Sequence, residues 1–285
     1  MVCYSMARTM GWRLLVLIVV VTAGCGGFGF SDGDDPVTPA PVPTSSATTY
    51  PTGVGPTGVT SPSLLGSAHG DRLNGSGYTV TMNRTVRYAN GSLRSHLRVH
   101  VALDANRTHL ANISVRGHAA PVLLGRPPAT ASFWSDGDRY LRRLARDNQT
   151  IYNEYDPPDS YAGTWRYWVH TAALNGRPAA DVTRTVAPFH TRTRQSQQPD
   201  GTVYVIRGDR LRENTTSTAW TSRENATLVA HVTQSGLVRD YRTEYTTVTD
   251  GGDPVTVTRT VRFTGVGNTT VGPPPWRDKA QSTPG

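Results

Sequence analysis

The stretch Tyr78–Leu103, YTVTMNRTVRYANGSLRSHLRVHVAL, decides the fold of this chain. Apolar and polar residues alternate over residues 78–88, and they alternate again over residues 93–103. Alternation with a period of two predicts a strand that buries one face. The residues between the two runs include Asn90-Gly91, and Asn-Gly is a preferred centre of a tight hairpin turn. The stretch therefore predicts an antiparallel β-hairpin.

Further strand-like runs follow this hairpin at short intervals. They cover Thr108–Arg116, Thr130–Trp134, Arg139–Ala145, Ile151–Tyr155, Val182–Thr191, Thr202–Gly208, Ala226–Thr233, Leu237–Thr249 and Val255–Thr264. Two stretches have helical spacing instead, namely Pro62–Leu73 and Tyr161–Leu174. We therefore expect an α+β fold that is mainly antiparallel β, with the helices covering the apolar face of the sheet.

The N-terminal segment has the features of a lipoprotein signal peptide. Arg8 and Arg13 precede an apolar run that is about half the length of ~20 residues needed to span a bilayer. Thr22, Ala23 and Gly24 then lead to Cys25, which resembles a lipobox. An ordinary cleavable signal with a chance cysteine is the alternative. We expect cleavage before Cys25, a lipid on that cysteine, and attachment to the extracellular face of the membrane.

The composition divides the rest of the chain into three parts. Residues 25–61 are rich in Pro, Thr, Ser and Gly, which predicts a lipid-anchored disordered tether. Residues 62–276 are expected to form a single β-rich domain, and residues 277–285 a disordered tail. Residues 1–24 are the signal peptide. No further segment is apolar and long enough to predict a transmembrane helix.

Asparagine is concentrated in glycosylation sequons. Nine of the eleven asparagines begin an Asn-x-Ser/Thr triplet, far more than chance placement would give. They are Asn74, Asn83, Asn90, Asn106, Asn112, Asn148, Asn214, Asn225 and Asn268. In an exported protein each is a candidate N-glycosylation site. Some, such as Asn90, also suit turns, and both roles are compatible because hairpin tips are exposed.

Charge and cysteine content exclude several classes of function. The formal charge is +8, and Lys279 is the only lysine. The arginines are spread evenly rather than concentrated in one run, which argues against nucleic-acid binding. Cys25 would be the only cysteine of the mature chain, so no internal disulfide or cysteine-based zinc site is expected. We expect no cofactor and no metal, and protein partners cannot be read from the sequence.

No catalytic motif was found. His96 and His100 share one strand face, with His109 on a neighbouring run, but a third ligand is not identifiable. The carboxylates Glu154, Glu213, Glu224, Glu244, Asp156 and Asp159 are scattered, and there is no nucleophile elbow, phosphate loop or zincin motif. We therefore expect a protein that is not an enzyme, with an extracellular hydrolase as the weakest alternative.

Aromatic residues gather between residues 134 and 168. Such rings commonly fill a core, and they can also form a wall that binds carbohydrate or lipid. The candidate wall residues are Trp134, Tyr140, Trp165, Tyr167 and Trp168.

The order of these segments resembles that of known families. Together with the lipobox and tether, Asn83–Leu93, Tyr155–Asp159, Thr164–Trp168, Gly236–Tyr241 and Pro273–Trp276 resemble uncharacterised surface lipoproteins of halophilic archaea. The basic charge departs from the acidic composition usual in high salt. More distantly, the order is similar to the LolA/LppX-type half-barrel. That likeness implies a curved antiparallel sheet with one or two helices on its concave face, and a site for a lipid or other apolar ligand.

Two functions are thus expected from the sequence. The first is a membrane-anchored, non-enzymatic lipoprotein that binds a lipid or other apolar small molecule in a half-barrel. The second is a structural or adhesive glycosylated protein of the cell envelope.

Overall fold

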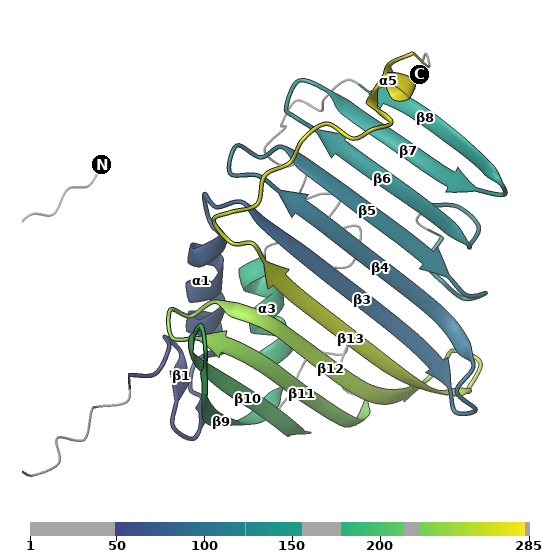
Figure 1. The fold of residues 1–285 in the computed structure, drawn as a ribbon. Coiled ribbons are helices and arrows are strands. Elements are labelled where there is room, and N and C mark those ends of the chain that lie inside the picture. Colours follow the sequence, from purple (N-terminus) through teal and green to yellow (C-terminus); the bar gives the residue numbers. More distant parts are fainter. Residues whose placement is uncertain (1–48, 123, 156–177, 214–222, 283–285) are drawn as a thin grey trace, which may run out of the picture. The chain divides into compact units, whose positions relative to one another are not determined.

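The computed structural model describes residues 49–122, 124–155, 178–213 and 223–282. The described residues belong to one compact unit, Thr48–Gly285. Its main feature is an 11-stranded antiparallel sheet that is curved but not closed (Figure 1). The prediction of a mainly antiparallel α+β fold with helices on a curved sheet is confirmed.

The sheet consists of two meanders that meet in its middle. Strands run in the order β8-β7-β6-β5-β4-β3-β13-β12-β11-β10-β9, so the pairing of β3 with β13 joins the two halves (Figure 1). The bounds are β3 Tyr78–Tyr88, β4 Leu93–Leu103, β5 His109–Arg116, β6 Ala129–Ser135, β7 Tyr140–Arg146, β8 Gln149–Tyr155, β9 Phe189–Gln198, β10 Gly201–Leu211, β11 Glu224–Thr233, β12 Val238–Val248 and β13 Pro254–Thr264.

The hairpin predicted from Tyr78–Leu103 is confirmed. β3 and β4 pair antiparallel, with Met82 opposite Val99. At the turn, Gly91 has a φ of 82°, which glycine adopts without strain. The backbone N–H of Ser92 donates to the side-chain oxygen of Asn90 at 3.0 Å. Alternate residues of these strands are buried, because one face of the sheet lies against the core.

Helix α1 (Pro62–Leu73) begins as its sequence predicts. Ser61 is the N-cap, and its hydroxyl accepts a hydrogen bond from the N–H of Leu64 at 3.3 Å. Pro62 then takes the first helical position, where the missing N–H leaves no intrahelical bond unmade. Gly66 permits a close approach of α3 (Pro178–Val186), because a Cβ there would collide with Ala179. The two helices lie side by side against the core face of the sheet (Figure 1).

The sequence prediction was wrong for residues 182–186. The run Val182–Thr191 was expected to be a strand, yet its first part belongs to α3 and only Phe189 onwards belongs to β9. Asp181, Val182, Thr185 and Val186 are buried along one helical stripe. The predicted helix Tyr161–Leu174 lies outside the described residues.

The domain extends beyond both boundaries that composition suggested. Residues 49–61 were assigned to the tether, but β1 (Val54–Gly55) and β2 (Gly58–Val59) form a small hairpin with both valines in the core. The hydroxyl of Tyr204 donates to the carbonyl oxygen of Thr49 at 2.8 Å. The prediction of a disordered segment is therefore wrong for residues 49–61. It stays a prediction for residues 25–48.

The C-terminal tail also contains structure. Helix α5 (Arg277–Gln281) lies beside β7 and β8 (Figure 1), and its Ala280 is fully buried. The predicted disordered tail from residue 277 is therefore wrong for this helix. No helix among the described residues is long and apolar enough to cross a membrane.

Candidate functional site

The concave face of the sheet is its apolar face. The register aligns Met82, Val99, Ile113, Ala131 and Leu144 in one row across β3 to β7. Every member of this row is buried. The row exists because each strand alternates with a period of two and neighbouring strands pair without slippage at these positions. The concave face therefore provides a continuous apolar surface across half of the sheet.

Three of the concave side chains on β5 and β6 are small. Ala111, Ala129 and Ala131 each pair with larger residues on both neighbouring strands. All three are nearly fully buried, which keeps this surface away from water. Three concave positions of β5 and β6 therefore carry only a methyl group.

A polar group borders this apolar surface at the β7–β8 edge. An Arg142 guanidinium nitrogen donates to the side-chain oxygen of Asn153 at 2.8 Å. The guanidinium carbon lies 5.1 Å from the ring centre of Tyr155, a cation–π geometry. Tyr140 and Tyr155 lie with their ring centres 6.2 Å apart. The guanidinium group of Arg142 thus lies at the border of the apolar surface formed by the row from Met82 to Leu144.

A second polar group lies beneath α3. Arg259 of β13 donates to both carboxylate oxygens of Asp181, at 3.0 and 2.8 Å, and the hydroxyl of Tyr241 also donates to Asp181. Burial raises the pKa of Tyr241 well above its usual value, so the phenol stays protonated and donates. Burial alone would lower the pKa of Arg259, but Tyr241 and Asp181 raise it. This buried group joins α3 to the sheet.

Two residues of the predicted aromatic wall, Trp134 and Tyr140, lie on opposite faces of the sheet. Tyr140 lies on the concave face, because it pairs with Ser135 and follows the same alternation as Phe133. Trp134 points to the opposite, convex face, where it packs with Leu141, Trp276 and Ala280. Trp165, Tyr167 and Trp168 lie outside the described residues, as do Thr22, Ala23, Gly24, Cys25 and Asn214.

The three histidines considered for a metal site lie on two faces of the sheet. His96 and His100 share the convex face, where Thr85 and Thr81 bond their Nδ1 atoms at 3.0 and 2.9 Å. His109 lies on the concave face and is fully buried. Within the described ranges, no group of three or more His, Cys, Asp or Glu side chains could hold a metal ion.

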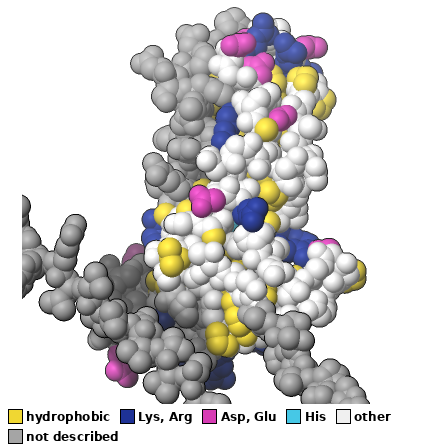
Figure 2. Space-filling view, turned by 90° about the vertical axis from the view of Figure 1, so that its left-hand side faces the viewer, with side chains coloured by type: hydrophobic (Ala, Val, Ile, Leu, Met, Phe, Trp, Pro, Cys, Tyr) yellow, Lys and Arg dark blue, Asp and Glu magenta, His cyan; other side chains and the backbone are white. Residues whose placement is uncertain are grey.

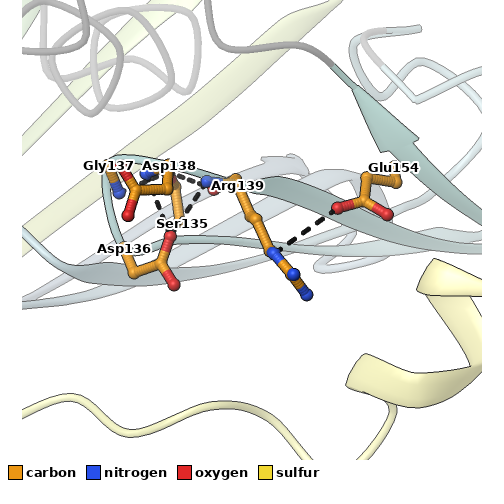
Figure 3. Close-up of polar contacts among 6 residues, drawn as sticks. All are labelled: Ser135, Asp136, Gly137, Asp138, Arg139 and Glu154. Atoms are coloured by element: carbon orange, nitrogen blue, oxygen red, sulfur yellow. Dashed lines mark hydrogen bonds and ion pairs between the residues drawn. The ribbon is translucent and has the colours of Figure 1, made fainter.

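The described carboxylates on the sheet serve structural contacts. Asp136 accepts hydrogen bonds from the backbone N–H groups of Asp138 and Arg139, which shapes the β6–β7 turn (Figure 3). Glu154 lies 4.0 Å from Arg139 (Figure 3). Glu244 bonds Arg242 and Thr258. Asp156 and Asp159 lie outside the described residues.

Most sequon asparagines lie at exposed turns or bulges. Asn74, Asn90, Asn106, Asn148, Asn225 and Asn268 are exposed. Asn83 and Asn112 lie in the middle of β3 and β5 and are only partly exposed. Asn112 also accepts a short hydrogen bond, 2.6 Å, from the hydroxyl of Ser132.

Comparisons with known proteins bear on the fold alone. Neither protein-family models nor curated proteins gave a match, so the resemblance to archaeal surface lipoproteins stays a prediction. Among solved structures, LprF from Mycobacterium bovis is similar at 9% identity and a TM-score of 0.37, covering 77% of this chain and 99% of its own. A LolA superfamily protein of Nitrosomonas europaea is 9% identical, with a TM-score of 0.23 and coverage of 73% and 93%.

A third solved structure is a putative outer membrane lipoprotein-sorting protein domain from Vibrio parahaemolyticus. It is 6% identical, with a TM-score of 0.24 and coverage of 75% of this chain and 95% of its own. Identities and TM-scores this low say nothing about function, which must be argued from this chain's own residues.

Sequence reasoning missed the residues that give the concave face its polar borders. Arg142 and Arg259 occupy core-facing positions; the other such positions of β13 are apolar, whereas β7 also places Arg146 on this face. That break in the alternation was visible in the sequence. Their partners, Asn153 and Asp181, could not be predicted from the sequence, because pairing across strands and helices depends on tertiary structure.

Proposed function

We propose that this chain is a lipid-anchored extracellular protein, without enzymatic activity, that binds a lipid or other apolar ligand on the concave face of its sheet. One observation carries the proposal. The row from Met82 to Leu144 on this face is apolar from β3 to β7, methyl side chains stand at Ala111, Ala129 and Ala131, and all of these residues are buried. Apolar ligands bind in such environments, with a few polar groups setting their orientation.

The cationic border supports a ligand with one polar end. Arg142 lies next to the apolar row, where Phe133 pairs with it across β6 and β7. An acyl chain on the alanine surface would place its carboxylate or ester oxygens towards this edge. A guanidinium is well suited to such oxygens, because it offers several donors in a fixed plane.

Native mass spectrometry of the full-length chain, purified from its membrane in mild detergent, tests the proposal. We expect a bound apolar molecule that is lost under denaturing conditions, whereas a covalent anchor lipid remains. The Ala131→Phe variant should lose at least nine-tenths of this adduct, because a ring would fill the alanine surface. Overpacking there also costs about 1–3 kcal/mol of stability, so folding is checked by thermal unfolding.

Ala145→Phe is the matched control, since Ala145 lies on the neighbouring strand but on the convex face. It should keep the adduct. If the wild-type chain carries only its anchor and glycans, the carrier function is wrong. The structural or adhesive glycoprotein then becomes the better account, because six sequon asparagines are exposed around the sheet.

Anchoring and glycosylation are tested by the denatured mass. We expect a mature chain that begins at Cys25 and carries a two-chain lipid, and a Cys25→Ser variant that no longer sediments with membranes. Peptide mapping should find glycans at exposed turns, and none at Asn83 and Asn112 inside strands. An unmodified Cys25, or chains glycosylated mainly within strands, would contradict these assignments.

A further inference from the structure

The convex face of the sheet contains a polar depression, on the side of the sheet opposite to the proposed apolar site. It has a volume of about 380 Å³ and lies over β4 to β7. Arg98 and Arg143 stand at its two sides, and short polar side chains line its floor. The full lining is Arg98, His100, Asn112, Ile113, Ser114, Thr130, Ala131, Ser132 and Arg143.

The strand register explains why the depression exists. One cross-strand row contains Arg98, Ser114 and Thr130, and the adjacent row contains His100, Asn112, Ser132 and Arg143. Short side chains on the two middle strands are thus flanked by long arginines on the outer two. Strands lie about 4.8 Å apart, so the backbones of Arg98 and Arg143 are about 14 Å apart across the strands, and because the two residues stand in adjacent rows they are also offset by about 7 Å along them. Both arginine side chains can reach over the floor from opposite sides.

Hydrogen bonds orient the floor so that it presents donors. The oxygen of the Asn112 amide accepts from Ser132 at 2.6 Å, which leaves the Asn112 NH₂ group to face a ligand. The Nδ1 atom of His100 is engaged by Thr81 at 2.9 Å, so Nε2 is the ring nitrogen left for the depression. Two guanidinium groups and an amide NH₂ then surround one small space.

Positive charge predominates around the depression, and the convex-facing carboxylate of Glu154 on the neighbouring strand β8 is paired with Arg139. The adjacent strands β13 and β3 to β7 contain no aspartate or glutamate. On the convex face of β12, Asp240 is paired with His231, and Glu244 with Arg242. Among the described residues, neither Arg98 nor Arg143 forms an ion pair. By contrast, basic and acidic side chains are interspersed on the side of the molecule shown in Figure 2.

Besides burial, the positive charge of nearby arginines also lowers the pKa of the histidines His96 and His100. Burial, and then the charge of Arg98, lowers the pKa of His100 below its usual value. His96 is affected in the same direction by burial and by Arg116, Arg98 and Arg87. The histidines are therefore neutral at pH 7, and the arginines supply the positive charge of the depression.

We propose that this depression is a binding site for an oxyanion, namely a sulfate, phosphate or sugar carboxylate group. Guanidinium groups match the planar or tetrahedral arrangement of such oxygens and bind them through charge-assisted hydrogen bonds. The site lies on the other face of the sheet from the apolar site, and Ile113 and Ala131 border both. It also conflicts with a glycan on Asn112, which would fill the same space.

Equilibrium titration of the full-length chain in neutral detergent tests the site. The probes are inorganic sulfate, inorganic phosphate and glucuronate at low ionic strength, where screening is weak. We expect saturable binding of at least one probe. Arg98→Gln and Arg143→Gln should each weaken it at least about tenfold, since a hydrogen bond to a charged group is worth about 1.5–3 kcal/mol and tenfold corresponds to about 1.4 kcal/mol. The preferred probe identifies the source, a free inorganic ion or an acidic sugar.

Arg262→Gln is the matched control, because Arg262 is exposed on the convex face but does not line the depression. It should change the affinity by less than about twofold, as expected for a screened charge outside the site. Equal weakening by all three variants would overturn the proposal in favour of a diffuse charge effect. Absence of saturable binding by every probe, or a glycan on Asn112 in the purified chain, would overturn it outright. Unchanged melting temperatures would show that the variants fold.

Discussion

Replacing Arg259 with leucine is expected to lower the free energy of unfolding by about 3–5 kcal/mol, because it leaves the buried carboxylate of Asp181 without its counter-charge. Only 6% of the Asp181 side chain and 17% of the Arg259 side chain are exposed. Tyr241 still donates one hydrogen bond to the carboxylate, but a neutral phenol does not compensate a buried charge. Urea unfolding followed by circular dichroism measures the loss.

Two further variants test whether the loss of stability comes from the uncompensated charge of Asp181. Arg239→Leu breaks a pair with Asp200, which is 60% exposed, and should cost at most about 1 kcal/mol. The double variant Asp181→Asn with Arg259→Leu should recover at least half of the loss, because an asparagine needs no counter-charge. If the double variant is as unstable as Arg259→Leu alone, the loss comes from packing of the arginine rather than from an uncompensated charge.

Lowering the pH from 7.5 to 5 is expected to remove about 4 kcal/mol of stability, because two histidines are buried in the neutral form. Burial lowers the pKa of His69 and of His109 from 6.5 to about 4. The unfolded chain therefore binds protons between pH 6.5 and pH 4 that the folded chain does not. Each histidine contributes fully to the free energy of unfolding above pH 6.5. This contribution falls as the pH decreases, and about 2 kcal/mol per histidine is lost at pH 5.

The variant His69→Asn should reduce this pH dependence by about half. His69 is fully buried, and its Nδ1 accepts a hydrogen bond from the N–H of Val238 at 3.2 Å, which an asparagine oxygen can also accept. Exposed His190 serves as the control, and His190→Asn should leave the slope unchanged. Glu244 does not contribute in this window, because its hydrogen bond from Arg242 lowers its pKa below 4.5. If His69→Asn does not change the pH dependence of the free energy of unfolding, a group other than His69 is responsible for it.

Asp181 in the first result and His69 in the second connect the helices to the sheet. Asp181 belongs to α3 and His69 to α1, and each contacts β12 or β13 through a polar side chain inside an apolar core. Such buried polar contacts favour one arrangement of the helices, because any other leaves a charge or an N–H without its partner. The helices pack against β12 and β13. Ala111, Ala129 and Ala131 lie in the other half of the sheet, on β5 and β6.

Local patterns in the sequence were enough to predict most strands. The period of two in residues 78–103 places Val99 and Val101 on one face and His96 and His100 on the other, as the structure confirms. Turns could be predicted for the same reason, since Asn90-Gly91 suits a backbone with positive φ. These features depend on neighbours within a few residues and therefore need no knowledge of the rest of the chain.

The errors have a common physical cause. Residues 182–186 contain valine and threonine, which favour strands, but burial of Asp181 and Val182 against β13 and α1 stabilises a helix instead. The composition of residues 49–61 predicted a disordered segment, yet Val54 and Val59 are buried in the core and β2 packs against β9 and β10. In both cases a distant part of the chain provides the stabilising contact.

By itself, the sequence determined the secondary structure of the sheet, the identity of its apolar face, and the expectation of a lipid-anchored, glycosylated chain. Tertiary structure decided the order of strands, the pairing of β3 with β13, and the separation of Trp134 from Tyr140 onto opposite faces. It also brought together Arg98 and Arg143, which are 45 positions apart in the sequence. The physical reason is that alternation is local, whereas register and sheet order depend on which distant strands pair.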